Sequence, residues 1–587
     1  MTSILNSKSF KKSSIALCLM GLNLSAVAQI TAPPTNNDQY TGLIFDSTFT
    51  ESSKAYLQAF ANSGIYRVHK ADGTTEDLKA KELNGQLSVE VNVTEKDLFF
   101  SYSDFGGVGI LHDIYGKPLP NFIFNFKENV NFGLIEVAEL VKSKFNIAEN
   151  KTMAFYGGLN SRAIDITQSG YLDISGEKAS VKFINLNAEN ESFALVSVID
   201  TWNGPGSAGG LTINVQDIEF INSNITPSNR KIALKTNGGN AKLTANEFTI
   251  HSDKEASRFT HGLLVEHMGD INITANNVTI DANNAVSAVG DPDDGYLPDG
   301  LLAEITIKAN SAHIFGQTSA GVGGKVNYLQ DSALFPSQKL HLINEGADAI
   351  LAFESVKEGQ SVINIETNTF ISSQGVDTEY HGTESDGLVA AIRSTQGSLV
   401  NLNTDASRYE IYGDIIATRL GIDHSFTSTI NIGGTGTVIV GNALASNASV
   451  IDISLNQNGF WHGMANDFRF DLNKEEIDHN ISAKNPSYLI SEAGVINVSL
   501  NNNSAWYVSG NSNISKLSID NGVLDLRGWE TTKQSDNEYH QLTTDTLSSQ
   551  NGQLFIHANW IGTYKAGQPL YLKEDFYSLS KPLTTWC

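Results

Sequence analysis

The sequence predicts an all-β fold, a parallel β-solenoid in which short strands stack coil upon coil. Its 587 residues hold 50 Gly but only 12 Pro and 5 Met, and Asn and Ser separate short runs of Val, Ile, Leu and Phe. That composition is typical of many short strands joined by tight turns. A recurring phrase also runs through the chain at intervals near multiples of about 20 to 35 residues, the range of known repeat units.

The phrase reads apolar-polar-apolar, a turn that often contains Asn, and apolar-polar-apolar again. It occurs at 243–250, 271–280, 305–314, 363–371, 430–432, 451–455 and 496–500. Stacking equivalent strands in parallel leaves few free edges along the shaft. Because side chains alternate along a strand, we expect four residues of one repeat to face the core and four to face water. The first four are Ile271, Ile273, Val278 and Ile280, and the second four are Asn272, Thr274, Thr279 and Asp281.

The repeated asparagines are interpreted as turn residues. They are Asn246, Asn276, Asn310 and Asn368. Asparagine tolerates left-handed backbone, and stacked amides in successive coils can hydrogen-bond one another. We therefore expect ladders of these side chains along the shaft.

The first 28 residues read as a secretory signal peptide. Lys8, Lys11 and Lys12 form the basic region, Ile15 to Leu24 is a short apolar core, and Ala26-Val27-Ala28 is a small-x-small site. The predicted cleavage lies between Ala28 and Gln29. The apolar run is shorter than the roughly 20 residues that a membrane-spanning helix needs.

Cysteine content and net charge limit the disulfides and the binding partners expected for the mature chain. Cleavage removes Cys18 and leaves Cys587 alone, which excludes an intramolecular disulfide in the mature chain. The formal net charge of −25 becomes −28 once the three signal lysines are removed. Nucleic acid is not an expected partner, because phosphate binding needs a basic face.

The region 29–154 carries no clear repeat and is predicted to form a cap or head, since the open end of a solenoid must be covered. Tyr40 to Phe60 and Asn131 to Phe145 are possible short helices, whereas Leu87 to Val93 and Phe122 to Phe126 read as strands. The predicted shaft covers 155–528.

Ser499 to Gly528 carries the most specific pattern in the chain. A strand ending in Leu-x-Asn, then Trp506, a Gly-Asn-Ser turn, a Leu-x-Ile strand and an Asn-Gly turn follow one another. This order resembles the C-terminal coils of type V secretion autotransporter passenger domains. The resemblance covers the chain from about 155 onward and is strongest after 430. It implies a right-handed parallel β-helix.

Residues 529–587 resemble the C-terminal segment that helps such passengers fold. The family carries a linker helix and an outer-membrane translocator barrel after it, whereas this sequence stops at Cys587. The expectation is a chain truncated before the barrel, or a barrel supplied by another polypeptide. Export by the signal peptide then implies a cell-surface or extracellular location, or a periplasmic one if no translocator is supplied.

A polysaccharide hydrolase or lyase is the alternative, because β-helices also carry such enzymes. The inverting hydrolases share Asn-Thr-Asp, a later Asp-Asp, Gly-His-Gly and Arg-Ile-Lys on neighbouring coils. Asn403-Thr404-Asp405 and Asp293-Asp294 occur in the reverse order, and the last two motifs are missing. The pairs His261-Gly262, His381-Gly382 and His462-Gly463 lack the preceding glycine. No enzyme activity is expected.

Other candidate sites are weak. The loop with Asp291, Asp293, Asp294 and Asp299 has oxygen ligands for calcium but no EF-hand spacing, so a solvated turn is the favoured interpretation. Ser207 lacks the glycine pattern of a nucleophile elbow. The histidines His251, His261 and His267 lack a zinc motif and are expected on the surface or in turns. No metal or cofactor is predicted.

Four tryptophans, Trp461, Trp506, Trp529 and Trp560, raise the idea of a sugar platform. Trp461 and Trp506 follow matching strands, which favours stacked structural positions in neighbouring coils. Taken together, the resemblance implies a Gram-negative virulence factor that acts as an adhesin or in autoaggregation and biofilm formation. The expected partners are host-cell surface or matrix components, or a second copy of the chain.

Overall fold

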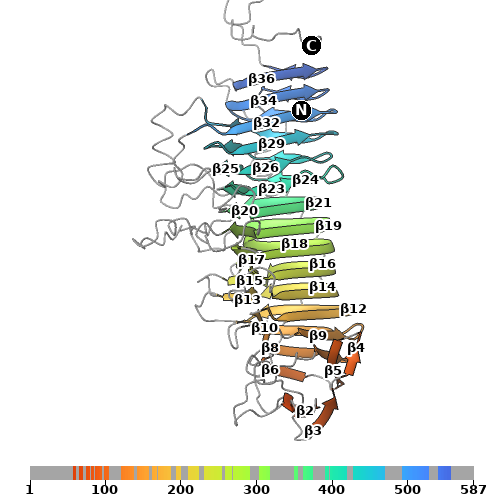
Figure 1. Ribbon diagram of the computed structural model, residues 1–587. Coiled ribbons are helices and arrows are strands. Elements are labelled where there is room, and N and C mark those ends of the chain that lie inside the picture. Colours follow the sequence, from red (N-terminus) through yellow and green to blue (C-terminus); the bar gives the residue numbers. More distant parts are fainter. Residues whose placement is uncertain are drawn as a thin grey trace, which may run out of the picture. The chain divides into compact units, whose positions relative to one another are not determined.

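Figure 1 shows the computed structural model, in which every described element is a β-strand and the strands stack in sequence order. The structure describes residues 57–60, 65–69, 75–79, 81–84, 86–94, 98–104, 121–137, 142–157, 162–167, 169–186, 193–199, 209–223, 231–253, 258–267, 269–290, 303–317, 350–353, 361–374, 390–395, 397–418, 427–469, 492–527 and 540–556. All of them belong to one unit, Tyr40–Cys587. The predicted all-β class is confirmed for these residues.

Each coil contributes strand segments to three ladders, which we call the first, second and third faces. Six long strands run from the first face into the second: β12 Tyr171–Asn185, β14 Gly210–Asn222, β16 Asn240–Ser252, β18 Gly269–Gly290, β19 Ala303–Gln317 and β21 Ser361–Gln374. β18 continues into the third face, where it pairs with β17 and β20. Every pairing between neighbouring coils is parallel among the described ladders from β5 onward, a solenoid-like arrangement.

The first face contains nine further strands: β5 Gln86–Val93, β7 Asn121–Phe126, β9 Lys142–Ile147, β23 Leu399–Leu402, β26 Thr429–Ile432, β29 Val450–Leu455, β32 Val495–Asn501, β34 Ser512–Asp520 and β36 Leu542–Gln550. The second face contains β10 Thr152–Gly157, β24 Tyr409–Tyr412, β27 Val438–Val440, β30 Phe460–Gly463, β33 Ala505–Val508, β35 Val523–Asp525 and β37 Gln553–Phe555.

The third face contains β11 Ile164–Ile166, β13 Phe193–Ile199, β15 Lys231–Asn237, β17 Phe259–His267, β20 Ile350–Phe353, β22 Ile392–Thr395, β25 Ile415–Thr418, β28 Ala443–Ala445 and β31 Ala465–Asn466. β6 Leu98–Asp104 and β8 Val130–Val137 serve both the second and the third faces. Three antiparallel strands form a separate small sheet: β1 Leu57–Phe60, β2 Ile65–His69 and β3 Thr75–Lys79. β4 Lys81–Leu83 pairs antiparallel with β5.

The alternation predicted for the repeat at 271–280 is confirmed. Ile271, Ile273, Val278 and Ile280 are at most 1% exposed. Their polar neighbours Asn272, Thr274, Thr279 and Asp281 lie on the outer side, half-buried or exposed. Because this alternation repeats in coil after coil, the inward residues of all three faces join one continuous core.

The helix considered for Asn131 to Phe145 is wrong. β8 and β9 occupy this range, and they pair in parallel with strands of the next coils. Their burial alternates with the period of two that strands require, which places Phe132 and Phe145 in the core. The two strands read at Leu87 to Val93 and Phe122 to Phe126 are confirmed as β5 and β7. Within Tyr40 to Phe60, the described residues are those of β1, again a strand.

Aromatic residues fill part of the interior of the second face. Phe132, Phe155, Phe183 and Phe220 stack coil upon coil, with ring centroids 5.3, 5.1 and 4.6 Å apart. The predicted stacking of Trp461 on Trp506 is confirmed, with centroids 4.3 Å apart and rings 5° from parallel. Each indole N–H donates to a backbone carbonyl, Gly441 at 2.9 Å and Gly463 at 3.0 Å. These tryptophans are fully buried, so they provide no sugar platform.

Candidate functional site

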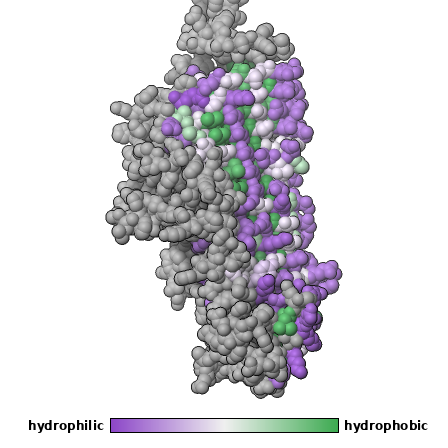
Figure 2. Space-filling model, in the orientation of Figure 1, coloured by the Kyte–Doolittle hydropathy of each residue, from purple (hydrophilic) through white to green (hydrophobic). Residues whose placement is uncertain are grey.

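A ladder of polar side chains follows the outer side of the first face. Its members are in register on successive strands: Asn272, Thr306, Asn364, Asn401, Asn431, Asp452 and Asn497. Asn401 donates to Asn364 at 2.9 Å, Asn431 donates to Asn401 at 2.8 Å, and Asn497 donates to Asp452 at 2.7 Å. In Figure 2, hydrophilic columns run along the stack beside a narrower hydrophobic strip. A primary amide has two donor hydrogens, and each of these bonds uses one of them.

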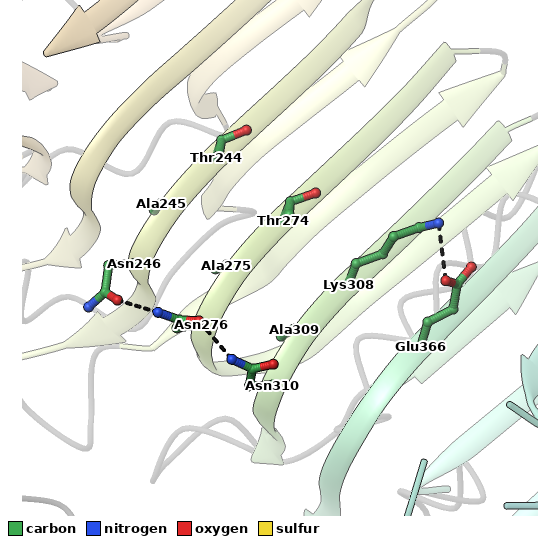
Figure 3. Close-up of a pocket in the computed structure, with 10 residues that line it drawn as sticks. All are labelled: Thr244, Ala245, Asn246, Thr274, Ala275, Asn276, Lys308, Ala309, Asn310 and Glu366. Atoms are coloured by element: carbon green, nitrogen blue, oxygen red, sulfur yellow. Dashed lines mark hydrogen bonds and ion pairs between the residues drawn. The ribbon is translucent and has the colours of Figure 1, made fainter. Parts of the chain in front are cut away.

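A shallow pocket of about 480 Å³ lies where β16, β18 and β19 turn from the first face into the second (Figure 3). Three parallel rows of Thr or Lys, Ala and Asn line it: Thr244, Thr274, Lys308; Ala245, Ala275, Ala309; Asn246, Asn276, Asn310. Asn276 donates to Asn246 at 2.5 Å, and Asn310 donates to Asn276 at 2.7 Å. The Nζ atom of Lys308 lies 3.1 Å from Glu366. The amide and hydroxyl groups of this lining can hydrogen-bond a polar ligand, and its two charged groups are paired with each other.

The expected asparagine ladder is thus confirmed for three of its four residues. Asn368 lies opposite Ser311 across a register shift and accepts the backbone N–H of Arg408 at 2.9 Å instead. The three ladder residues lie inside strands, and the left-handed asparagines are found elsewhere: Asn84, Asn150, Asn447, Asn458, Asn502, Asn503, Asn521 and Asn551. The interpretation of Asn246, Asn276 and Asn310 as turn residues is therefore wrong, because they lie inside strands that continue the parallel pairing around the corner.

Two carboxylates face each other on adjacent coils: Asp270 of β18 lies opposite Glu304 of β19. Thr306 and Asn364 donate to Glu304 at 3.1 and 2.8 Å, while Asn272 donates to Asp270. Burial raises the pKa of Asp270, the hydrogen bond from Asn272 opposes this, and the charge of Glu304 raises it further. The pair does not line the pocket described above. The carboxylate pair and the pocket are therefore separate features.

An ionic cluster joins three coils on the outer side of the second face. Glu219 lies 2.7 Å from Lys182 and 2.9 Å from Nε2 of His251. Burial would raise the pKa of Glu219, but the hydrogen bonds and charges of His251 and Lys182 outweigh it and lower the pKa from 4.5 to about 2. The cluster holds a carboxylate ionised at neutral pH. Lys182 and His251 are both paired with Glu219, so we interpret the cluster as a structural contact between neighbouring coils.

Several predicted site residues lie outside the described residues. They are Ala28 and Gln29 at the predicted cleavage site, Ser207, the loop Asp291 to Asp299, His381, Trp529 and Trp560. Asn403, Thr404 and Asp405 follow β23 on the surface, but Asp293 and Asp294 are not described. Among the described residues, no group of three or more His, Cys, Asp or Glu side chains is placed to hold a metal ion. The same residues include no helix long and apolar enough to cross a membrane.

The expectation of surface or turn histidines is wrong for His261. This side chain is fully buried on β17, with Nε2 3.5 Å from the amide nitrogen of Asn284. Five consecutive residues, 261–265, are buried here, and the buried amide of Asn284 gives the imidazole a polar neighbour. His251 lies on the outer side, half-buried against Glu219.

Sequence reasoning missed the outer side of the C-terminal second face, because it assumed polar outward residues throughout. The signal was present in Phe460-Trp461-His462, where adjacent aromatic residues must point to opposite sides of one strand. Trp461 is buried, and its neighbours face outward and are half-buried.

Comparison with known proteins gives no relative: no model of a protein family matches the chain, and no curated protein or solved structure shows significant similarity to it.

Proposed function

We propose that this chain is the passenger of a type V secretion autotransporter, a right-handed parallel β-helix that acts as a cell-surface adhesin or autoaggregation factor. The observation that carries the proposal is the unbroken coil-on-coil pairing from β5 to β37. Such a stack extends by adding coils, and each coil is stabilised mainly by its neighbours. It suits a protein that presents repeated contacts rather than one catalytic centre.

The chemistry of the outer sides supports the same function. The amide ladder and the pocket at β16 to β19 offer many neutral donors and acceptors spaced by one strand separation, about 4.8 Å. Each such contact with a surface is weak, and affinity then comes from several contacts made at once. Host-cell surface or matrix polymers are repetitive partners of this kind.

Export and assembly belong to the same proposal. A signal peptide cleaved between Ala28 and Gln29 would deliver the chain across the inner membrane, and an outer-membrane translocator would bring it to the surface. The last coils, β32 to β37, would fold first outside the cell and act as a template for the coils before them. Parallel pairing supports addition of one coil at a time, and the C-terminal start of this order comes from the resemblance.

The test is surface display. Residues 29–587 fused to an unrelated outer-membrane anchor on a non-clumping bacterium are expected to cause settling of the culture or binding to host cells. The same anchor without the passenger is the control for clumping by the host bacterium, and surface labelling of the fused chain verifies its display. If intact displayed chain produces neither clumping nor host-cell binding, the adhesin proposal is wrong and a passive surface fibre becomes the better hypothesis.

A polysaccharide hydrolase or lyase is the second candidate, and the Asp270 and Glu304 pair is the observation in its favour. Two carboxylates on adjacent coils, one with a raised pKa, are the minimal set for acid catalysis of glycosidic cleavage. The engagement of Glu304 by Thr306 and Asn364 argues against it. Release of reducing ends from a panel of polysaccharides, abolished in Asp270→Asn, would establish the enzyme.

A further inference from the structure

Three turns between the first and second faces carry an Asn-Gly pair at the same place in the coil. They are Asn458-Gly459 between β29 and β30, Asn521-Gly522 between β34 and β35, and Asn551-Gly552 between β36 and β37. All three asparagines have left-handed backbone, with φ of 65°, 56° and 54°. Each asparagine is exposed and each glycine is buried. The three pairs therefore match in sequence, conformation and exposure, and differ in their place in the stack.

An Asn-Gly pair can lose ammonia in water. The backbone nitrogen of the glycine gives its proton to hydroxide and attacks the Cγ atom of the asparagine. A C–N bond forms, and the side-chain amide takes a proton from water and leaves as ammonia. Water then opens the five-membered succinimide to aspartate or isoaspartate. Glycine favours this reaction because it has no side chain to shield its nitrogen.

The left-handed turn holds the two reacting atoms apart. At its ψ of about +47°, the nitrogen of the following residue points away from Cβ across the Cα–C bond. The Cγ atom, which is attached to Cβ, is then out of reach of that nitrogen. The turn must open before the succinimide forms, so the rate at each pair follows the free energy of local opening.

Two of the three turns are held by coils on both sides. The N–H of Asn503 in the preceding coil donates to the carbonyl oxygen of Asn521 at 2.7 Å, and the N–H of Asn521 donates to Gln550 in the next coil at 2.9 Å. The turn at Asn458 has the same support, through Asn502 in the next coil at 3.1 Å and Gly436 in the preceding coil at 2.9 Å. Opening either turn breaks hydrogen bonds to two neighbours.

The turn at Asn551 is held from one side. The described residues include no coil after β37, and the hydrogen bonds of this turn go to the preceding coil. The N–H of Asn521 donates to Gln550, and the N–H of Gln553 donates to the carbonyl oxygen of Gly522, both at 2.9 Å. Opening this turn therefore breaks contacts with one neighbour.

The last described coil also buries less apolar surface than the coil before it. Thr544 and Ser549 of β36 lie opposite two buried isoleucines of β34, Ile514 and Ile519. Leu547 is 37% exposed although its partner in β34 is buried. Few buried apolar contacts and exposed backbone hydrogen bonds are the marks of a region that opens locally.

We infer that Asn551 is a site of spontaneous deamidation in the folded chain, whereas Asn521 and Asn458 are protected by the coils on both sides. The reagents are water and hydroxide. The inference does not depend on the proposed function.

Isoaspartate would change the last coil. It adds one atom to the main chain at the turn and places a carboxylate there. The register of β37, in which Leu554 lies opposite Leu524, depends on this turn, as does the contact of the Phe555 ring with Arg527 at 4.6 Å. Deamidation should therefore loosen β37 and leave the earlier coils in place.

The test is peptide mapping by mass spectrometry of the full chain kept at pH 9 and 37 °C. We expect a gain of about 1 Da and isoaspartate at Asn551, formed at least about ten times faster than at Asn521 or Asn458. In 8 M urea, where no turn is held, the three pairs should react at rates within about threefold of one another. Circular dichroism before and after the incubation verifies that the first sample stays folded.

Two results would overturn the inference. One is an equal or slower rate at Asn551 than at the other two pairs in the folded chain. The other is no product at Asn551 over a time in which the chain in urea reacts completely.

A pair of variants tests whether opening of the last coil limits the rate. Thr544→Ile with Ser549→Ile supplies the residues that β34 has at the opposite positions, and should slow the reaction at Asn551 at least about threefold in the folded chain but not in urea. Thr546→Ile with Ser548→Ile makes the same exchanges opposite Lys516 and Ser518, which are not buried, and should change the rate less than about twofold. An unchanged rate in the first variant, with folding verified by circular dichroism, would refute control by local opening.

Discussion

The N-terminal and C-terminal halves of the second face share the same inward–outward alternation but differ in which side of the sheet carries the aromatic rings. From β8 to β14 the inward column is Phe132, Phe155, Phe183 and Phe220. The outer side of β12 to β16 carries the cluster of Lys182, Glu219 and His251. From β19 to β27 the equivalent inward column is Ile314, Ile371, Ile411 and Ile439, and aromatic rings lie outside. Strand period fixes which positions point inward, while the residue type at outward positions is free to serve other contacts.

The largest expected effect tests this contrast directly. Phe183→Ala removes an inward ring from a stacked, fully buried column and should lower the free energy of unfolding by about 3 to 5 kcal/mol, through lost burial and the cavity left behind. Phe370→Ala removes an outward ring of the same face and should cost about 1 kcal/mol or less. Denaturant unfolding followed by circular dichroism compares the two. Equal losses would show that the outward ring of Phe370 contributes to stability as much as a core residue.

The ionic cluster of Lys182, Glu219 and His251 should make the stability of the chain depend on pH. The folded-state pKa of Glu219 is about 2, below its ordinary value, so its contribution to stability is present above about pH 4.5 and is lost as the pH falls toward 2. Glu219→Gln should lower stability at pH 7 by about 1 to 2 kcal/mol, reduced by solvent screening of a half-buried group.

The difference between wild type and Glu219→Gln should shrink to nothing near pH 2. Thermal melts of both proteins at pH 7, 4.5, 3 and 2 measure it. A difference that is constant across this range would mean that packing, rather than charge, explains the loss. Asp217→Asn, on the same strand, controls for a general effect of removing a negative charge.

The amide ladder should have a smaller effect. Asn401 bonds to Asn364 and to Asn431, and Asn401→Ala removes both contacts for a loss of about 1 to 2 kcal/mol. Asn276 also makes two amide contacts, but its side chain is exposed and water replaces them, so Asn276→Ala should cost about 0.5 kcal/mol. Equilibrium unfolding of both variants tests the order, and a larger loss at Asn276 would contradict it.

The smallest effect has the opposite sign. The raised pKa of Asp270 means that its ionised form is disfavoured in the folded chain, so it reduces stability at neutral pH. Asp270→Asn should increase stability at pH 7 by a few tenths of a kcal/mol, and the gain should vanish at acidic pH where Asp270 is protonated. Paired melts at pH 7 and pH 3 measure the change. A loss of stability at pH 7 would show that the Asn272 contact outweighs burial and the charge of Glu304.

Much of the fold could be predicted because the same strand pattern occurs many times along the sequence. Ile271, Ile273, Val278 and Ile280 were assigned inward from alternation alone, and the stacking of Trp461 on Trp506 from matching strands. Prediction failed at 131–145, where Phe, Val and Ile are mixed with charged residues and no Asn-centred phrase marks the coil. It also failed for the turn assignment of Asn246, Asn276 and Asn310, since asparagines inside a strand and in a turn look alike in sequence.

The candidate surfaces were less predictable. Asp270 and Glu304 are 34 residues apart, and Lys182 and His251 are brought to Glu219 from two other coils. Their register depends on loop lengths between coils, which vary along the chain. A repeated sequence pattern indicates that two strands are equivalent, but it does not fix their register. One extra residue in a strand moves every later side chain to the opposite face of the sheet.

The sequence by itself determined that the chain is all-β, that its strands alternate with a period of two, and that equivalent strands stack. These follow from local composition and from repetition, because burying the apolar side of each coil requires a neighbouring coil. Only the tertiary structure decided which outward residues share a column. That depends on register between distant strands, which places Phe370 and Phe460 in one outward column and Tyr412 and Tyr507 in the next.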